Sequence, residues 1–221
     1  TALVDVLAHS VDGHRGGLPE HNGDLMSDAE TLSVYAAKAQ EYADMVKTEA
    51  DKPMLKRFVA DLPEGGVALD IGCGPGFAAG EMAAAGIEAH AWDPVPEMIA
   101  LAATYSGVQT RQAGYGDLDA VAVYDGIWSN FSMLHTPLAD WPDQFAAIAR
   151  ALKPGGLFHF GTKLGTGEAR DSIGRMYSYM SEEALVALLT DTGFTVETKH
   201  TGEEAGLSGE VAPFIVLQAR A

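Results

Sequence analysis

A glycine-rich stretch flanked by two carboxylates is the part of this sequence best suited to bind a ligand. Asp70 precedes a bend that contains Gly72, Gly74 and Gly76, and Asp93 follows 23 residues after Asp70. Glycines permit positive φ angles and remove the Cβ atoms that would keep a ligand away from backbone N–H groups. An acid at the end of the next strand suits a bidentate grip on ribose hydroxyls. The pattern therefore predicts a ligand that contains ribose.

A histidine beyond a predicted strand is a candidate for proton transfer. His135 lies shortly after residues 124–130, where a second reactant would enter the site. Its near-neutral reference pKa suits a catalytic general base. The alternative is a histidine that only borders the pocket or packs beneath it.

Basic and tyrosine side chains gather in residues 163–180 of an otherwise acidic chain. Those able to donate hydrogen bonds are Lys163, Arg170, Arg175, Tyr177 and Tyr179. They predict binding of an anionic or carboxylate-bearing substrate. Alternatively, Arg170 and Arg175 pair with Glu168 and Asp171 and only order this segment, which is longer than a usual loop between a strand and a helix.

No spacing of histidine, cysteine or acidic residues indicates a metal site. His9, His14 and His21 lie in an irregular N-terminal stretch and match no ligand pattern. The single cysteine, Cys73, lies inside the glycine-rich bend, where a small side chain packed behind the ligand explains it. We expect no metal cofactor.

The elements that position these residues alternate along the chain. Strands are expected at 67–71, 87–92, 108–113, 124–130, 157–162, 194–201 and 214–220, and helices at 77–85, 96–106, 141–152 and 181–191. This alternation predicts a parallel sheet covered by helices on both faces. No helix-length segment separates the last two strands, so they are expected to form an antiparallel hairpin at one edge.

Helices are also expected before the alternating region. One begins at a capping box of Ser27 and Glu30 and carries Tyr35 and Tyr42 on one face, and a second covers 53–60. The expected organisation is a flexible arm (1–26), N-terminal helices that form a lid (27–64) and the main domain (65–221). The two tyrosines belong either to the lid or to ordinary packing of the helix face.

Composition excludes several classes of protein. The formal net charge is −17, from 31 acids and 14 bases, and a field of this sign disfavours nucleic-acid partners. No run of 18 apolar residues is present, so no membrane span is expected. The N-terminal residues lack a secretory pattern and there is a single cysteine, from which we expect a cytoplasmic protein.

Four motifs, in order, resemble those of the class I S-adenosylmethionine (SAM)-dependent methyltransferases. They are the acid–x–Gly–x–Gly–x–Gly run from Asp70 to Gly76, and residues 91–93, 124–130 and 152–156. The resemblance implies a three-layer, Rossmann-like α/β sandwich whose seven-stranded sheet is mostly parallel with the last strand antiparallel. It also implies SAM as the cofactor.

The resemblance further implies which residues contact SAM. The glycines would lie beside its methionine part with Asp70 near the ammonium group, and Asp93 would hold the ribose. The remaining implied contacts are Pro94, Met98, Gly114, Tyr115, Asn130, Phe131, Tyr35 and Tyr42. Many family members place an acid after the third strand to accept from the adenine amino group, where this chain has Gly114 and Tyr115. Either backbone groups serve there or Asp117 reaches back.

A nicotinamide dehydrogenase is the alternative for the fold. Its fingerprint, G-x-G-x-x-G, would require glycine where this chain has Phe77. A bulky residue there is a poor host for a pyrophosphate at the helix N-terminus. The spacing therefore favours the methyltransferase.

The predicted function is transfer of a methyl group from SAM to a small-molecule acceptor by in-line displacement, which needs alignment and exclusion of water rather than a metal. A non-catalytic SAM-binding or regulatory protein is the alternative from another class. Methylation of protein or RNA would require a broad accessory surface or a basic face, and neither is evident in the sequence.

Overall fold

The computed structural model describes residues 28–48 and 53–221. The predicted arm at 1–26 and the predicted cap at Ser27 lie outside the described residues. The first helix, α1 (Ala29–Ala37), is capped by Asp28, whose side chain accepts a hydrogen bond from the Thr31 N–H. The N-cap is therefore Asp28, one residue after the predicted Ser27.

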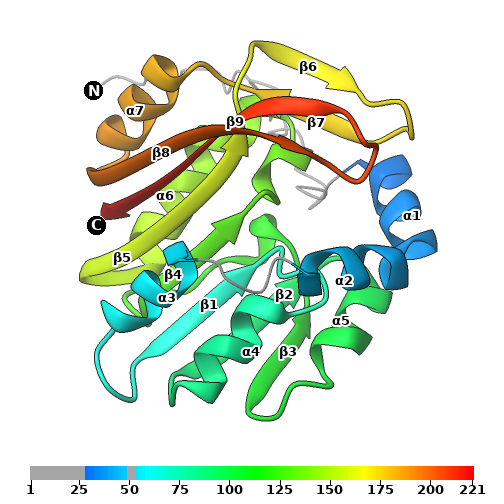
Figure 1. Ribbon diagram of the computed structural model, residues 1–221. Coiled ribbons are helices and arrows are strands. Elements are labelled where there is room, and N and C mark those ends of the chain that lie inside the picture. The colour runs from blue at the N-terminus through cyan, green and yellow to red at the C-terminus, as the bar shows by residue number, and fades with distance from the viewer. Residues whose placement is uncertain (1–27, 49–52) are drawn as a thin grey trace, which may run out of the picture.

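The main sheet has seven strands in the order β3-β2-β1-β4-β5-β9-β8 (Figure 1). The strands are β1 (Val67–Ile71), β2 (Glu88–Asp93), β3 (Val108–Gln112), β4 (Tyr124–Asn130), β5 (Leu152–Lys163), β8 (Thr195–Ala205) and β9 (Val211–Arg220). Neighbours from β3 to β5 pair in parallel, whereas β9 is antiparallel to both β5 and β8. The predicted mixed sheet with an antiparallel last strand is confirmed.

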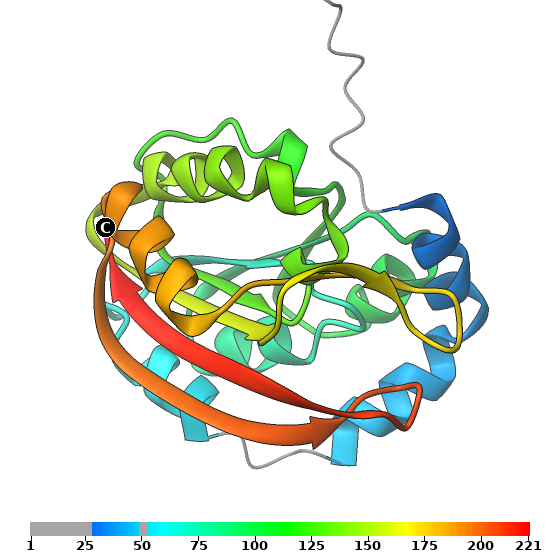
Figure 2. The ribbon, with the colours of Figure 1, turned by 90° about the horizontal axis from the view of Figure 1, so that it is seen from above.

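Helices cover both faces of the sheet (Figure 2). On one face lie α3 (Pro53–Ala60), α4 (Phe77–Ala84) and α5 (Pro96–Ala102), and on the other α6 (Trp141–Ala151) and α7 (Glu182–Asp191). Successive β1 residues point to opposite faces of the sheet. Ala68 packs in the apolar core with residues of α3 and α4, and Leu69 packs with residues of α6 and α7. Burial on both faces explains why this strand reads as a continuous apolar run.

The predicted N-terminal helix with Tyr35 and Tyr42 is two helices. α1 ends at Lys38, whose φ of −114° and ψ of 17° are not helical, and α2 (Ala39–Thr48) follows at once. The hydrophobic period continues across this break, so the pattern identified the buried face and not the interruption. The side chain of Ser181, in contrast, caps α7 as expected.

The sequence predicts a long loop over residues 163–180. The structure instead contains a β-hairpin there. β6 (Gly167–Arg170) pairs antiparallel with β7 (Met176–Tyr179) in a separate two-stranded sheet. β6 is exposed throughout and lacks the apolar alternation that reveals a strand. β8 and β9 likewise extend well beyond their predicted ends, because the added residues are held by cross-strand pairing.

Phe58 anchors α3 to the sheet, and its loss is expected to destabilise the fold. The side chain is fully buried, and its ring packs edge-on against Trp128 at 5.2 Å between centroids. Phe58→Ala should lower the free energy of unfolding by about 3–5 kcal/mol, because a cavity replaces the ring. Urea denaturation measures this loss. The control Val121→Ala, at a residue 66% exposed, should change stability by less than about 0.5 kcal/mol; equal effects would contradict the assignment.

Candidate active site

The glycine-rich turn joins β1 to α4 and is tied to the neighbouring strand. Gly72, Gly74 and Gly76 have φ angles of 67°, 52° and 84°. The N–H groups of Gly72 and Cys73 both donate to the Trp92 carbonyl at the end of β2, at 2.7 and 2.9 Å. The turn is therefore fixed by the sheet before any ligand binds.

The two predicted carboxylates both accept backbone hydrogen bonds at or next to this turn. Asp70 Oδ2 accepts from the Ala79 N–H in α4, at 3.2 Å. Asp93 accepts from the Gly74 N–H through Oδ2 and from the Val95 N–H through Oδ1, both at 2.9 Å. Burial raises the pKa of Asp93 to about 6. Its carboxylate thus already positions the backbone that a ligand would meet.

A cavity of about 620 Å³ opens at the carboxyl ends of β1, β4 and β5, and a second of about 60 Å³ lies between the glycine-rich turn and α5. Both are lined by the same set of residues: Tyr35, Tyr42, Gly72, Gly74, Asn130, Phe131 and His135. The two cavities therefore meet at these side chains. Asp70, Lys163, Arg175 and Tyr177 line only the larger one, and Asp93, Pro94, Met98, Gly114 and Tyr115 only the smaller.

Three predicted site residues line neither cavity. Gly76 is the left-handed residue before α4, where a Cβ atom would lie 2.6 Å from that of Ala102. Arg170 points to α1, and Tyr179 stacks on Tyr177 at 6.0 Å. The structure thus gives Gly76 a role in packing the turn and places Arg170 and Tyr179 outside the cavity walls.

A directed chain of hydrogen bonds runs through Tyr35 at the junction. His135 Nδ1 lies 2.7 Å from the Met176 carbonyl, which can only accept, so this nitrogen carries the proton. Nε2 is then the acceptor for the Tyr35 hydroxyl at 2.8 Å, and that oxygen in turn accepts from Arg175 Nη1 at 2.8 Å. Both imidazole nitrogens are therefore engaged. Burial lowers the pKa of His135 to about 3, so the ring is neutral at physiological pH.

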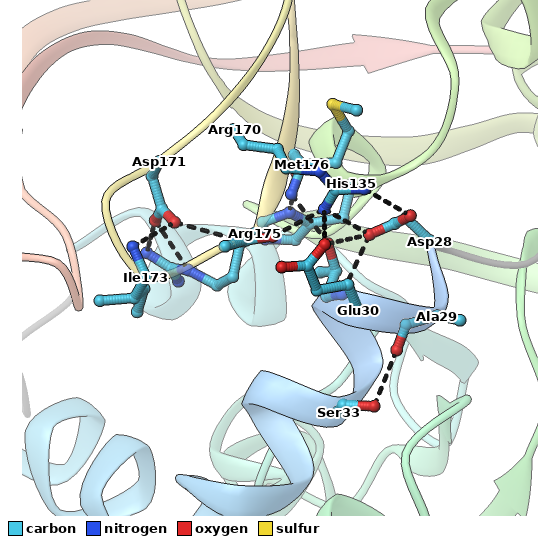
Figure 3. Close-up of polar contacts among 12 residues, drawn as sticks. Asp28, Ala29, Glu30, Ser33, His135, Arg170, Asp171, Ile173, Arg175 and Met176 are labelled. Carbon is cyan, nitrogen blue, oxygen red and sulfur yellow. Dashed lines mark hydrogen bonds and ion pairs between the residues drawn. The ribbon is translucent and has the colours of Figure 1, made fainter.

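The arginines of the hairpin order it, although with one unexpected pairing. The buried Arg175 donates from Nε and Nη2 to Asp171 Oδ2 at 3.0 and 2.7 Å, as the second interpretation predicted (Figure 3). Arg170 pairs with Asp28 and Glu30 rather than with Glu168 (Figure 3). The hydrogen bond from Arg170 lowers the pKa of Asp28.

These contacts fasten the N-terminal helices over the site. Beside the ion pairs at Arg170, the Met176 N–H donates to Thr31 Oγ1 at 2.8 Å, so the first turn of α1 is joined to the start of β7. Tyr42 follows on α2, with its Cε1 3.3 Å from where a Gly74 Cβ atom would be. Tyr42 of α2 therefore packs against the glycine-rich turn, and the lid formed by residues 27–64 stays a prediction.

Several cavity residues were missed by the sequence reasoning. The Trp128 and His159 rings, paired across β4 and β5, stack at 3.3 Å, and His159 Nε2 lies 3.1 Å from Asn130 Oδ1. Further walls come from α3 and from the β8–β9 hairpin, namely Met54, Leu55, His200, Glu204, Gly206, Phe214 and Val216. His159 could be recognised in the sequence as a polar residue within a buried strand. The β8–β9 hairpin carries no sequence motif that would identify its residues as part of the site.

After β3, Asp117 turns toward its own loop. Its Oδ2 accepts from the Gly114 N–H at 2.8 Å, so it reaches back to the backbone at the position where an acid was expected. The Tyr115 hydroxyl lies 2.7 Å from both Ser129 Oγ and Ser132 Oγ. These bonds tie the segment to β4 and to Ser132, the residue that packs against Gly72.

In the described ranges, no three His, Cys, Asp or Glu side chains gather in a way that could hold a metal ion. Likewise, none of the helices in these ranges has the length and apolar character needed to cross a bilayer.

Comparison with known proteins decides the family. The sequence-family model described as a methyltransferase domain matches residues 40–199, which is most of the chain. The chain belongs to this family. It is a class I SAM-dependent methyltransferase by fold and motif, so the predicted family and cofactor are confirmed.

Solved structures share the fold of this methyltransferase. The 1,6-didemethyltoxoflavin-N1-methyltransferase of Burkholderia thailandensis, with 1,6-didemethyltoxoflavin and S-adenosylhomocysteine bound, is 23% identical over 86% of this chain and 88% of that chain, with a TM-score of 0.65. A SAM-dependent methyltransferase of Methanosarcina mazei is 20% identical (77% and 97% covered, TM-score 0.63). The cyclase SpnF is 17% identical (76% and 79% covered, TM-score 0.60). No curated protein sequence matches the chain.

The site of the methyltransferase fits SAM in shape and charge. Gly72 and Gly74 present bare backbone to both cavities, and Asp70 lines the larger one, where a carboxylate suits a cationic ligand. A Cβ atom on Gly72 would lie 2.2 Å from the Ser132 Cβ, so the turn tolerates no side chain there.

Gly72→Ala is expected to weaken SAM binding more than tenfold, because the new methyl group collides with Ser132 and displaces the turn. Calorimetric titration with S-adenosylhomocysteine measures the affinity. Gly65→Ala is the matched control, since Gly65 has a similar φ of 65° but nothing within 4 Å of an added Cβ atom. Equal loss of affinity in both variants would show that backbone strain, and not the collision, is responsible.

His135 is expected to make the folded state less stable in acid. The unfolded chain binds a proton at this residue near pH 6.5, whereas the folded chain binds it only near pH 3. Between these values the unfolded state holds more protons, so stability falls as pH drops, by up to about 1.4 kcal/mol per pH unit. Urea unfolding at pH 7 and pH 5 should show a smaller decrease for His135→Gln than for the wild type. Identical decreases would contradict the buried neutral ring.

Proposed function

We propose that this methyltransferase transfers the methyl group of SAM to a small-molecule acceptor bound in the larger cavity. The observation that carries the proposal is that side chains from many different elements surround that cavity. Beside the strand ends, side chains from α2, α3, β7 and the β8–β9 hairpin all line it. A volume of about 620 Å³ lies in the range of small-molecule sites. A polymer would enter such a cavity only through a single inserted side chain or base, and its remainder would need a docking surface outside.

The junction of the two cavities is where the reactants would meet. When bound, SAM supplies a methyl group already activated for displacement. The chain's residues then have to align the acceptor and exclude water. Phe131 and Asn130, at the end of β4, border both cavities, and Tyr35 and Tyr42 close the same point from the lid.

Within this proposal, His135 positions Tyr35 rather than taking a proton from the acceptor. Its two nitrogens are occupied by the Met176 carbonyl and the Tyr35 hydroxyl, and its lowered pKa makes it a weak base. The imidazole thereby sets the direction of the hydroxyl at the junction. The general-base role predicted from sequence would require this hydrogen bond to break first.

The structural neighbours support a small acceptor without fixing the reaction. The Burkholderia thailandensis enzyme, named for methylation of a small molecule, aligns with most of this chain. SpnF, described as a cyclase, has a comparable fold. Fold alone therefore does not establish methyl transfer, and the experiment must detect the transferred group.

The test is incubation of the chain with methyl-labelled SAM and a mixture of metabolites below the size of peptides. We expect label in a small molecule and an equal amount of S-adenosylhomocysteine. Asp93→Asn should raise the KM for SAM at least about tenfold, because an amide has one acceptor oxygen and can no longer accept from both the Gly74 and the Val95 N–H groups. Asp143→Asn, at an exposed position of α6, is the control.

Three results would contradict the proposal. Binding of SAM without turnover in any mixture would indicate a non-catalytic SAM-binding protein. Label found in added protein or RNA, and not in small molecules, would indicate a macromolecular acceptor. Equal kinetics for Asp93→Asn and the control would place SAM elsewhere.

A further inference from the structure

A lysine faces the acceptor cavity without an acidic partner. Lys163 ends β5 and lines the larger cavity, and its Nζ lies 4.3 Å above the centre of the Tyr177 ring. Within residues 28–48 and 53–221, its ammonium group forms no hydrogen bond or ion pair. A half-buried cation of this kind has lost part of its hydration without a carboxylate to replace it.

The neighbouring arginine is already neutralised. Arg175 donates twice to Asp171 and once to Tyr35, and both members of the ion pair are buried. Its charge therefore serves the hairpin and the lid. Among the described residues that line the cavity, Lys163 is then the lysine or arginine left to meet an anion.

The ammonium group lies beside bare backbone in the cavity lining. A Cβ atom on Gly206, in the turn between β8 and β9, would make only van der Waals contact, 3.5 Å from Lys163 Nζ and 4.0 Å from Arg175 Nη2. Because Gly206 has no side chain and lines the same cavity, it leaves Lys163 Nζ uncovered on this side.

The acids nearby do not fill this role. Asp171, Glu210 and Glu204 each raise the pKa of Lys163, but burial and the charge of Arg175 outweigh them, so the net shift is downward. A bound anion would reverse this imbalance. Bulk charge matters less here, because the field of the chain's other acids is screened over about 8 Å at physiological ionic strength.

Apolar side chains lead from Lys163 to the junction. Phe214 pairs with Lys163 across β5 and β9 and packs edge to face on Phe131 at 5.8 Å, and Val216 and Tyr177 line the same cavity. A molecule that reaches from the junction to Lys163 would lie against these side chains. Its body therefore has to be apolar or aromatic.

We infer that the acceptor is an organic anion, with an acidic group bound at Lys163 and an apolar or aromatic body lying on the Phe131–Phe214 wall. The inference rests on the proposed methyl-transfer function and names its substrate class. Lys163 then determines specificity, because a neutral analogue would leave its ammonium group buried and unpaired.

The test divides the metabolite mixture by anion exchange and assays each fraction with methyl-labelled SAM. We expect the label in the fraction that the resin retains. With that fraction, Lys163→Met should raise the acceptor KM roughly 10- to 100-fold while leaving the affinity for S-adenosylhomocysteine unchanged. Lys199→Met, at an exposed lysine of β8 paired with Glu182, is the matched control and should behave as the wild type.

The possible outcomes distinguish failure of the anionic substrate class from failure of the proposed methyl transfer. Labelled product from the neutral or cationic fraction overturns the anionic class but upholds methyl transfer. Retained product with unchanged kinetics in Lys163→Met overturns the role of Lys163. No labelled product from any fraction, despite SAM binding, overturns the proposed function itself.

Discussion

The hydrogen bonds between the glycine-rich turn and the end of β2 are the constraint on which the site depends. The Trp92 carbonyl receives the N–H groups of Gly72 and Cys73, and the Asp93 carboxylate receives that of Gly74. Because the parallel pairing of β1 and β2 fixes where β2 ends, the sheet sets the path of the turn. The cavities form on the side of that turn left free of side chains.

The cofactor half of the molecule could be predicted because its requirements are local. The site needs glycines at 72 and 74 and acids at 70 and 93, each at a fixed distance from one of two strands. These strands can be identified in the sequence by their apolar runs. The acceptor half could be predicted only in part. Arg175 lines the cavity as expected, yet its partner Tyr35 is 140 residues away and only the folded chain brings them together.

The differences between expectation and structure have a common physical cause. The sequence predicts that Arg170 meets the substrate or pairs with Glu168, whereas the structure pairs it with Asp28 at the start of α1, a long-range contact that no sequence pattern reports. The hairpin β6–β7 and the long ends of β8 and β9 were missed for the same reason. Their stability comes from cross-strand hydrogen bonds and contacts with other elements rather than from their own hydropathy.

The β8–β9 hairpin has a consequence for how such a molecule can diversify. Its tip lines the larger cavity, and its pairing with the rest of the sheet is made only by β9 against β5. Residues at the tip can therefore lengthen, shorten or change chemistry while the nucleotide-recognition half keeps its register. An ancestral scaffold could in this way acquire new substrates by remodelling one ribbon, with its methyl donor inherited intact.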